Sequence, residues 1–193
     1  MEAFEQFVAL AMEAEGFLVS GPHKFPVKKL TKNKHQVVYQ THGYEVDLIG
    51  IRKDRLVLAT VKSFFGSTGI KAADVMSGRA RNSSGYKIIN NRELRDEIIR
   101  QAAETYGFAE RDVEMRLYGG KFMSKKGELE LRAWGAEQRV GAGPIGVYNA
   151  SDVVAKVRTL QSTTYRDNPI LVTLKVLDAA GALLPIPESK DEN

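Results

Sequence analysis

Two apolar runs separated by four charged residues constrain the fold of this chain more than any other feature. Residues 45–51 and 56–63 are rich in Val, Ile and Leu, and Arg52-Lys53-Asp54-Arg55 lies between them. This pattern predicts a β-hairpin with a short polar turn. A symmetric turn sets the facing pairs of the hairpin: Ile51 with Leu56, Ile49 with Leu58, Asp47 with Thr60, and Glu45 with Lys62.

Most other side chains of this hairpin are apolar on both faces, which is typical of a central pair of strands buried on both sides. Because side chains alternate between the faces of a strand, Glu45, Asp47, Thr60 and Lys62 are expected to share one face. A carboxylate and an ammonium group in a buried strand pair are costly unless they are paired, hydrated or bound to a metal. The hairpin therefore predicts a functional site, and a facing Glu45–Lys62 ion pair is the purely structural alternative.

An acid on one strand, followed fifteen residues later by a lysine on the next, resembles the PD-(D/E)xK nuclease superfamily. In that family an Asp and an acidic residue two positions before the Lys bind magnesium, and the Lys helps to activate water. Asp47 and Lys62 match the first and last positions, but Thr60 stands at the middle one, so the motif is D-x12-T-V-K. The resemblance implies Mg²⁺ or Mn²⁺ held by Asp47 and the Val61 carbonyl, with Asp74 on the following helix replacing the missing carboxylate.

Residues 2–15 are predicted to form an amphipathic helix that ends at Gly16. The segment FEQFVALAMEAEGFLV is similar to the first helix of Mrr-type restriction domains and Holliday-junction resolvases. In those proteins a Glu from this helix approaches the metal site, and Glu5 is the matching position here. The alternative is that Glu5 is a solvated residue favoured by the helix dipole.

Residues 23–35 carry five lysines and no acid, and they precede a strand predicted at residues 36–40. Such a segment can bind DNA phosphates by releasing their counterions, although charge runs are often only solvated loops. The candidate phosphate-binding residues are Lys24, Lys28, Lys29, Lys32 and Lys34, together with Arg79 and Arg81 farther along the chain.

The other segments predict an α/β protein. Ser67 or Thr68 is expected to cap a helix that runs to about Gly78, and residues 86–90 are expected to form a strand. Residues 1–90 would then follow the order helix, three strands, helix, strand, which is that of a restriction-endonuclease-like core. Later helices are predicted at 92–106, 125–139, 151–161 (capped by Ser151) and 168–181, and later strands at 113–118 and 145–148, with a strand at 170–176 as the alternative for the last helix.

We therefore expect one domain over residues 1–184, with a mixed central β-sheet flanked by helices, a nuclease-like core at 1–90 and an α/β elaboration at 91–184. Residues 185–193 are expected to be a disordered tail. The sequence Gly141-Ala-Gly-Pro-Ile-Gly146 spells GxGxxG, but it follows a predicted helix and leads into a strand, the reverse of a dinucleotide-binding context.

Composition excludes some functional classes. The chain has no cysteine, which rules out disulfides, a cysteine nucleophile and a thiolate zinc site. No apolar run approaches the roughly 20 residues that span a bilayer, so a soluble cytoplasmic protein is expected. A net charge of +4 is compatible with nucleic-acid binding.

The resemblance implies a metal-dependent DNA endonuclease that hydrolyses phosphodiester bonds, with DNA as the partner and a homodimer as a common state of related enzymes. The alternative is a catalytically degenerate DNA-binding protein on a nuclease fold, in which Thr60 marks lost metal affinity. The two hypotheses differ in whether a second carboxylate reaches Asp47.

Overall fold

A five-stranded mixed sheet forms the centre of the molecule in a computed structural model that describes residues 2–32, 37–78, 82–163 and 167–183. The strand order is β1-β4-β5-β6-β7, with antiparallel pairing from β1 to β5 and parallel pairing from β5 to β7. The bounds of these strands are β1 Leu18–Ser20, β4 Leu48–Arg52, β5 Arg55–Lys62, β6 Val113–Gly119 and β7 Gly146–Asn149. The predicted α/β class, with a mixed sheet flanked by helices, is confirmed.

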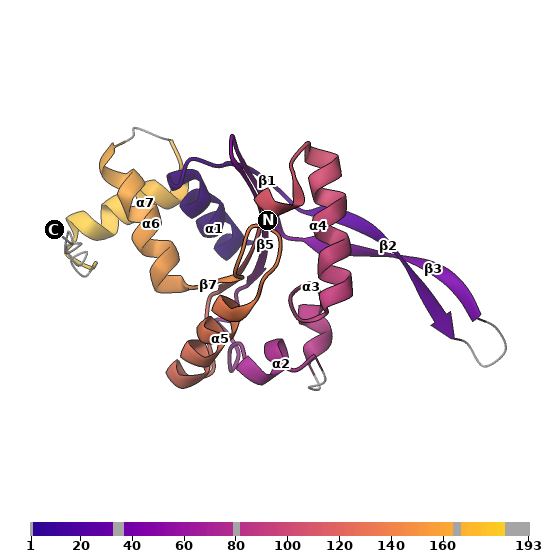
Figure 1. Cartoon of the computed structure of the whole chain (residues 1–193). Helices are drawn as coiled ribbons and strands as arrows, with labels where there is room; N and C mark the ends of the chain where they lie inside the picture. Colours follow the sequence, from indigo (N-terminus) through magenta and orange to yellow (C-terminus); the bar gives the residue numbers. More distant parts are fainter. Residues whose placement is uncertain (1, 33–36, 79–81, 164–166, 184–193) are drawn as a thin grey trace.

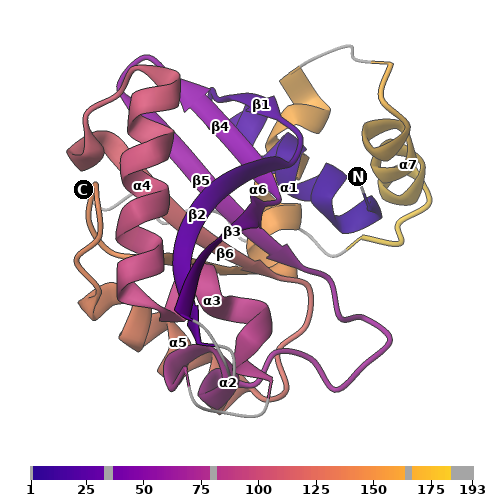
Figure 2. The ribbon, with the colours of Figure 1, turned by 90° about the vertical axis from the view of Figure 1, so that its right-hand side faces the viewer.

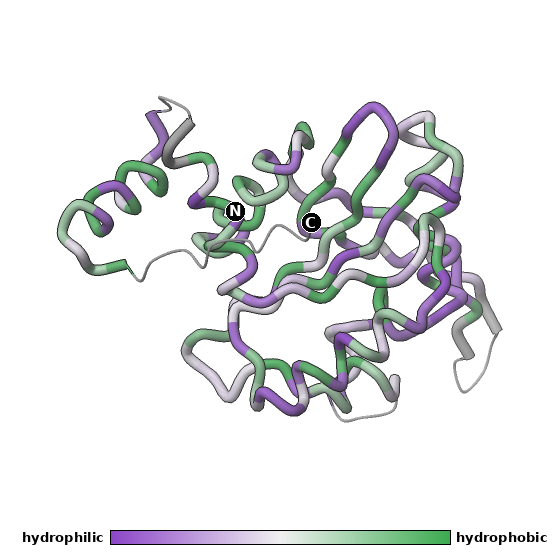
Figure 3. The backbone as a smooth tube through the Cα atoms, turned by 60° about the vertical axis from the view of Figure 1, so that its left-hand side comes forward, coloured by the Kyte–Doolittle hydropathy of each residue, from purple (hydrophilic) through white to green (hydrophobic). Residues whose placement is uncertain are grey.

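Helices cover both faces of this sheet (Figure 1). One face packs against α1 (Ala3–Ala14), α6 (Ala150–Thr163) and α7 (Pro169–Ala179), and the other against α2 (Ala72–Met76), α3 (Lys87–Asn90), α4 (Arg92–Tyr106) and α5 (Lys125–Glu137). Hydrophobic stretches run through the strands between these layers (Figure 3). Along β5, Leu56 and Leu58 belong to one buried cluster while Val57 and Ala59 belong to the other, as expected for a strand buried on both sides.

A second, two-stranded sheet projects from the body as a long ribbon (Figure 1). It pairs β2 (His23–Lys32) with β3 (Val37–Val46) in antiparallel register. The alternative of a solvated loop over residues 23–35 is therefore wrong for residues 23–32, which form a strand. Phe25 and Val27 are buried whereas Lys24 and Lys28 are exposed, a two-residue period that the run of lysines obscures in the sequence.

The register of the β4–β5 hairpin is confirmed near its turn and wrong beyond it. Ile51 faces Leu56 and Ile49 faces Leu58, as predicted. Asp47, however, forms a bend between β3 and β4, where the chain leaves one sheet for the other. Glu45 therefore pairs with Lys24 across the ribbon, at 3.4 Å between Oε2 and Nζ, and the predicted Glu45–Lys62 pair does not form.

Residues 67–90 differ from the prediction. The Ser67 hydroxyl donates to the Phe64 carbonyl at 3.1 Å and accepts from the Gly69 N–H at 3.2 Å, so it closes a turn instead of capping α2, which begins after Lys71. The predicted strand at 86–90 is wrong, since the chain forms a 3₁₀ turn, Ser83–Tyr86, followed by α3. A short apolar run suits a buried helical turn as well as a strand, and periodicity alone does not separate them.

After the short helices α2 and α3, the long helix and the strand that follow β5 are consequently α4 and β6, which lie beyond residue 90. The α4 boundaries match the prediction, because Asn91 accepts a hydrogen bond from the Leu94 N–H and Gly107 adopts a left-handed conformation with φ 75°. β6 and β7, from the predicted C-terminal elaboration, are strands of the same central sheet.

The helices α1, α5, α6 and α7 and the strands β6 and β7 lie within a few residues of their predicted bounds, whereas β1 was not predicted and the strand expected at 36–40 runs to Val46 as β3. The N-terminal cap of α6 is Asn149 and not Ser151, because Asn149 and Asp152 exchange backbone-to-side-chain hydrogen bonds of 2.8 and 2.9 Å. Residues 170–176 are helical, so the strand alternative is wrong. The predicted tail at 185–193 lies outside the described residues. No helix within the described ranges combines the length and the apolar character needed to cross a membrane.

The GxGxxG segment has a structural explanation. It joins α5 to β7, in the order helix then strand, and Gly141 adopts φ 53°. A Cβ atom on Gly141 would overlap the carbonyl oxygen of Val113, so the turn can pack on the start of β6 only with glycine.

Candidate functional site

The bend at Asp47 places a carboxylate beside the end of β5. The Asp47 N–H donates to the Ala59 carbonyl at 3.1 Å, and Asp47 Oδ2 accepts the Val61 N–H at 2.7 Å. The Asp47 carboxylate therefore accepts the Val61 N–H, which has no backbone partner on β4 because the chain bends away from the sheet at Asp47. Because the N–H and C=O of one residue in an antiparallel strand point toward the same neighbour, the Val61 carbonyl is directed to the Asp47 side.

Lys62, the last residue of β5, completes an ion pair with Asp47. Its Nζ lies 3.9 Å from Asp47 Oδ2, and the two side chains are only 26% and 16% exposed. The site lies at the carboxyl end of β5, where open α/β sheets commonly bind ligands. The structure thus brings together the acid and the lysine that the hairpin pattern singled out.

The electrostatics of Asp47 are dominated by burial. Burial raises the pKa of the Asp47 carboxyl, while the Lys62 ammonium and the Val61 N–H offset only part of this effect. The carboxylates of Glu5 and Glu45 raise the pKa further. The protein alone therefore disfavours the ionised form of Asp47, which a cation would stabilise.

Glu5 approaches this site from the first turn of α1, which packs on the same face of the sheet as α6 and α7. Its Oε2 accepts the Glu2 N–H at 2.9 Å, while the Glu2 carboxylate lies 3.4 Å from the Ser63 hydroxyl just after β5. The start of α1 is thus held against the end of β5. Glu5 both caps its helix and places the second carboxylate that acts on Asp47.

Thr60 is buried in the sheet, and Asp74 lies in a cavity separate from Asp47. Thr60 is 6% exposed and lies beside Leu117 in the parallel register of β5 and β6. Asp74 Oδ2 accepts a hydrogen bond of 3.4 Å from Asn82, and Asp74 lines a cavity together with Lys62 that Asp47 does not line. Lys62 therefore connects the Asp47 carboxylate with a separate cavity that contains Asp74.

The donor set can be compared with the needs of magnesium. Among the described residues, no three His, Asp or Glu side chains form a group able to hold a metal ion. Mg²⁺ usually keeps several waters and binds only one or two carboxylates together with substrate phosphates. Asp47 and Glu5 with the Val61 carbonyl fit such an open site, completed by water and substrate, and do not form an all-protein cage.

The candidate phosphate-binding lysines lie along the ribbon, whose base packs beside α4 (Figure 2). Lys24 pairs with Glu45, Lys28 is exposed, and the Lys29 ammonium lies 4.8 Å from the centre of the Tyr44 ring. Lys32 belongs to β2, but its side chain is outside the described part of the structure. Lys34, Arg79 and Arg81 are outside it altogether.

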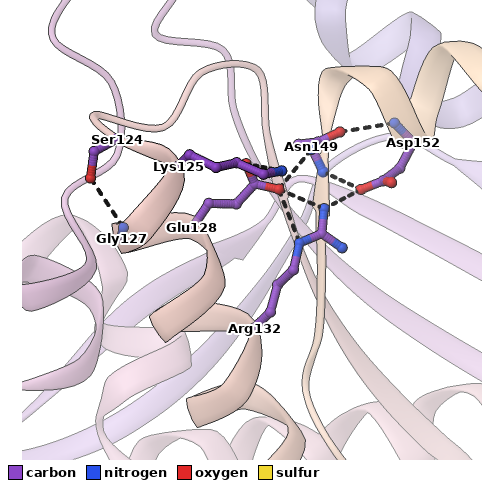
Figure 4. Close-up of polar contacts among 7 residues, drawn as sticks. All are labelled: Ser124, Lys125, Gly127, Glu128, Arg132, Asn149 and Asp152. Atoms are coloured by element: carbon purple, nitrogen blue, oxygen red, sulfur yellow. Dashed lines mark hydrogen bonds and ion pairs between the residues drawn. The ribbon is translucent and has the colours of Figure 1, made fainter.

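Two networks of charged side chains were not predicted from the sequence. In the first, Glu128 of α5 accepts hydrogen bonds from Asn149 at 2.7 Å and from Arg132 at 3.0 Å, and Arg132 also binds Asp152 (Figure 4). The Glu128–Arg132 spacing of one helical turn was a visible signal, but the partners after β7 were not. Since these charges pair with one another, the network joins α5 to α6.

The second network surrounds Arg116 of β6. Its guanidinium lies 2.8 Å from Glu15 at the end of α1 and 2.7 Å from Glu114, and it donates to the Tyr118 hydroxyl at 3.0 Å. Burial alone would lower the pKa of Arg116, but the Glu114 and Tyr118 contacts raise it above its usual value. Glu15 and Arg116 lie 101 positions apart, so no local pattern indicated this joint between α1 and the sheet.

Comparisons with known protein families, with curated proteins and with solved structures find no match for this chain. The functional conclusion therefore rests on the residues of the chain itself.

Proposed function

We propose that this protein is a metal-dependent DNA endonuclease that hydrolyses phosphodiester bonds. The observation that carries the proposal is the half-buried Asp47–Lys62 pair at the end of β5, with the Glu5 carboxylate acting on Asp47 from α1. A perturbed carboxyl group with a specific charged partner is a frequent mark of catalytic sites.

The chain order of the elements around the sheet supports the same proposal. With the β2–β3 ribbon and the short helical segments α2, Ser83–Tyr86 and α3 set aside, α1 is followed by the antiparallel strands β1, β4 and β5, then by α4 and by β6, which is parallel to β5. Reduced in this way, the order resembles the helix, three strands, helix, strand expected of a restriction-endonuclease-like core, with the last two elements beyond residue 90.

Each residue of the site has a distinct part in the proposed reaction. Asp47, Glu5 and the Val61 carbonyl would hold Mg²⁺ or Mn²⁺, and such an ion polarises a phosphoryl oxygen and lowers the pKa of bound water. The Lys62 ammonium has three donors, and at 3.9 Å from Asp47 Oδ2 it forms an ion pair without a hydrogen bond. Its donors are available to orient a water molecule or a phosphate oxygen.

Glu5→Gln tests the metal site. The amide oxygen can still accept the Glu2 N–H and preserve the cap of α1, but the charge that acts on Asp47 is lost. We expect the wild type to cleave supercoiled plasmid with Mg²⁺ or Mn²⁺ and not with EDTA, and Glu5→Gln to weaken metal binding by at least about tenfold. Metal titration of the cleavage rate measures both effects.

Glu93→Gln is the matched control, because Glu93 also lies in the first turn of a helix and is exposed on α4. Its metal dependence should equal that of the wild type. If Glu5→Gln were also unchanged, the second carboxylate would have to be Asp74, and Asp74→Ala would be the variant that loses metal.

The ribbon would supply sequence-independent affinity for DNA. Neither Lys28 nor Lys29 forms a salt bridge within the described part of the chain, so both ammonium groups are available for phosphates. Replacing both by Gln should reduce the slope of log affinity against log salt by about 1.8, at roughly 0.9 for each phosphate that is no longer neutralised. Fluorescence anisotropy with duplex DNA at several salt concentrations measures this slope.

The control for the ribbon is Lys53→Gln with Lys126→Gln, two exposed lysines in the β4–β5 turn and on α5. This double variant carries the same change in net charge but should keep the wild-type slope. If both double variants had the same slope of log affinity against log salt, Lys28 and Lys29 of the ribbon would not contact DNA phosphates.

Two observations favour the second candidate function, a catalytically degenerate DNA-binding protein. A buried threonine stands where the nuclease motif has its second acid, and the described residues contain no group of three potential ligands for a metal. Such a protein would keep the salt-dependent binding of DNA and would show no cleavage with any divalent metal.

A further inference from the structure

A cavity of about 240 Å³ lies beside Lys62, enclosed by the loop after β5, by α2 and by the 3₁₀ turn before α3. The residues that matter for its chemistry are Lys62, Phe64, Lys71, Asp74, Asn82 and Tyr86. Pockets for drug-sized ligands usually measure roughly 300–1,000 Å³, so this cavity suits a smaller chemical unit.

Tyr86 is the residue that most clearly points to a ligand. It is only 5% exposed and lines the cavity, yet its hydroxyl makes no hydrogen bond to any described residue. The hydroxyl is not one of the fully buried side-chain atoms that lack a partner, so it reaches the cavity, where a ligand or water can accept its hydrogen bond. Burial, reinforced by the nearby Asp74 carboxylate, raises the pKa of Tyr86 to about 12, so the hydroxyl remains a hydrogen-bond donor at neutral pH.

The charges around Tyr86 define what this donor could bind. Lys62 and Lys71 both line the cavity, and Lys71 forms no salt bridge within the described residues. Two ammonium groups and a phenolic donor suit a phosphate group. The cavity also holds an acceptor, since in the described part of the chain only Asp74 Oδ2 is engaged, by the Asn82 amide at 3.4 Å. A bare anion would make no use of this carboxylate.

Phe64 adds an aromatic wall. It is 38% exposed, lines the cavity and has a left-handed backbone with φ 47°, which is unusual for a bulky residue. The Ser67 hydroxyl bond to the Phe64 carbonyl holds this conformation. Nucleobases stack on exposed aromatic rings of this kind whatever their sequence.

We propose that this cavity binds one nucleotide unit of a DNA strand, with its phosphate between Lys62, Lys71 and the Tyr86 hydroxyl. The base lies against Phe64, and an amino or hydroxyl group of the nucleotide donates to Asp74. Because Lys62 also faces Asp47, the bound nucleotide adjoins the proposed cleavage site, and this placement next to the cleaved bond rests on the proposed nuclease function.

The test is calorimetric or NMR titration with deoxythymidine 5′-monophosphate at low salt in EDTA, with thymidine and inorganic phosphate as separate probes. Lys71→Gln should weaken binding of the nucleotide about tenfold, the value of one charged hydrogen bond. Tyr86→Phe should weaken it several-fold while its melting temperature stays at or above the wild-type value, because no hydrogen bond within the described protein is lost. Lys53→Gln and Tyr39→Phe, which alter exposed residues elsewhere, should bind like the wild type.

The proposal is overturned if the nucleotide shows no saturable binding, if all variants bind it equally, or if inorganic phosphate binds as tightly as the nucleotide. Its failure can be told apart from failure of the nuclease proposal, because the titration is carried out in EDTA and measures binding without cleavage. DNA cleavage without nucleotide binding refutes the cavity alone, and nucleotide binding without cleavage refutes the nuclease alone.

Discussion

Asp47→Asn is expected to reduce metal-dependent DNA cleavage by at least about 100-fold while leaving the fold at least as stable as the wild type. The Asn side chain keeps an oxygen that can accept the Val61 N–H, but it lacks the charge that would bind a metal. Burial raises the pKa of Asp47, which means that the folded protein disfavours the ionised carboxylate. The substitution therefore removes an unfavourable buried charge and a metal ligand together.

The stability difference should depend on pH with a definite sign. A carboxyl group with a raised pKa binds its proton more tightly in the folded state, so the wild type loses stability relative to Asp47→Asn as the pH rises above roughly 4. Below that pH the carboxyl is neutral in both states and the two proteins should converge. Chemical denaturation in EDTA across this pH range measures the difference.

Asp54→Asn is the control for the same hairpin. The Arg52 hydrogen bond lowers the pKa of Asp54, so its ionised form is favoured in the fold, and the substitution should act on stability in the opposite direction without affecting cleavage. Lys62→Ala should lose cleavage as Asp47→Asn does. If Asp47→Asn and Lys62→Ala both cleaved DNA at the wild-type rate, the Asp47–Lys62 pair would have no part in the reaction.

Arg116→Ala is expected to lower the free energy of unfolding by about 3–5 kcal/mol, because it leaves the Glu15 and Glu114 carboxylates without their buried partner. The matched control is Arg100→Ala on α4. Arg100 also bridges two carboxylates, Glu97 and Glu104, but its side chain is 45% exposed whereas that of Arg116 is 6% exposed. The control should cost less than about 1 kcal/mol, since solvent screens exposed ion pairs.

Urea denaturation of Arg116→Ala and Arg100→Ala at pH 7 measures the two losses in the free energy of unfolding, provided that the slope of this free energy against urea concentration is the same as in the wild type. Adding Glu15→Gln and Glu114→Gln to Arg116→Ala should recover part of the loss, because the two carboxylates then no longer lie uncompensated near the core. Equal losses for Arg116→Ala and Arg100→Ala would show that burial does not decide the effect of these bridges.

Features that depend on neighbours along the chain could be predicted from the sequence alone. The pairs next to the charged turn, Ile51–Leu56 and Ile49–Leu58, follow from turn length and from the two-residue period of strands. The helices α1 and α4 have their predicted extents because each combines an apolar stripe with a terminal signal, such as Gly16 or Asn91.

The points where the chain changes its partner depend instead on tertiary packing. Asp47 lies between Val46 and Leu48, where β3 runs directly into β4, and a one-residue bend leaves no mark in composition. Glu45 therefore faces Lys24 and not Lys62. Residues 86–90 had too few positions for a period to distinguish a helical turn from a strand, and their packing beneath α4 selected the turn.

The features of the candidate site also separate into those that the sequence predicted and those that depend on tertiary packing. The residue types and the strand spacing singled out Asp47 and Lys62, but the bend at Asp47, and not the predicted hairpin register, brings its carboxylate to Lys62. The approach of Glu5 to Asp47, the cavity shared by Lys62 and Asp74, and the bond from Glu15 to Arg116 each join elements distant in the chain. Such contacts depend on how helices pack on the sheet, a sum of many weak and non-directional apolar contacts that no short stretch of sequence contains.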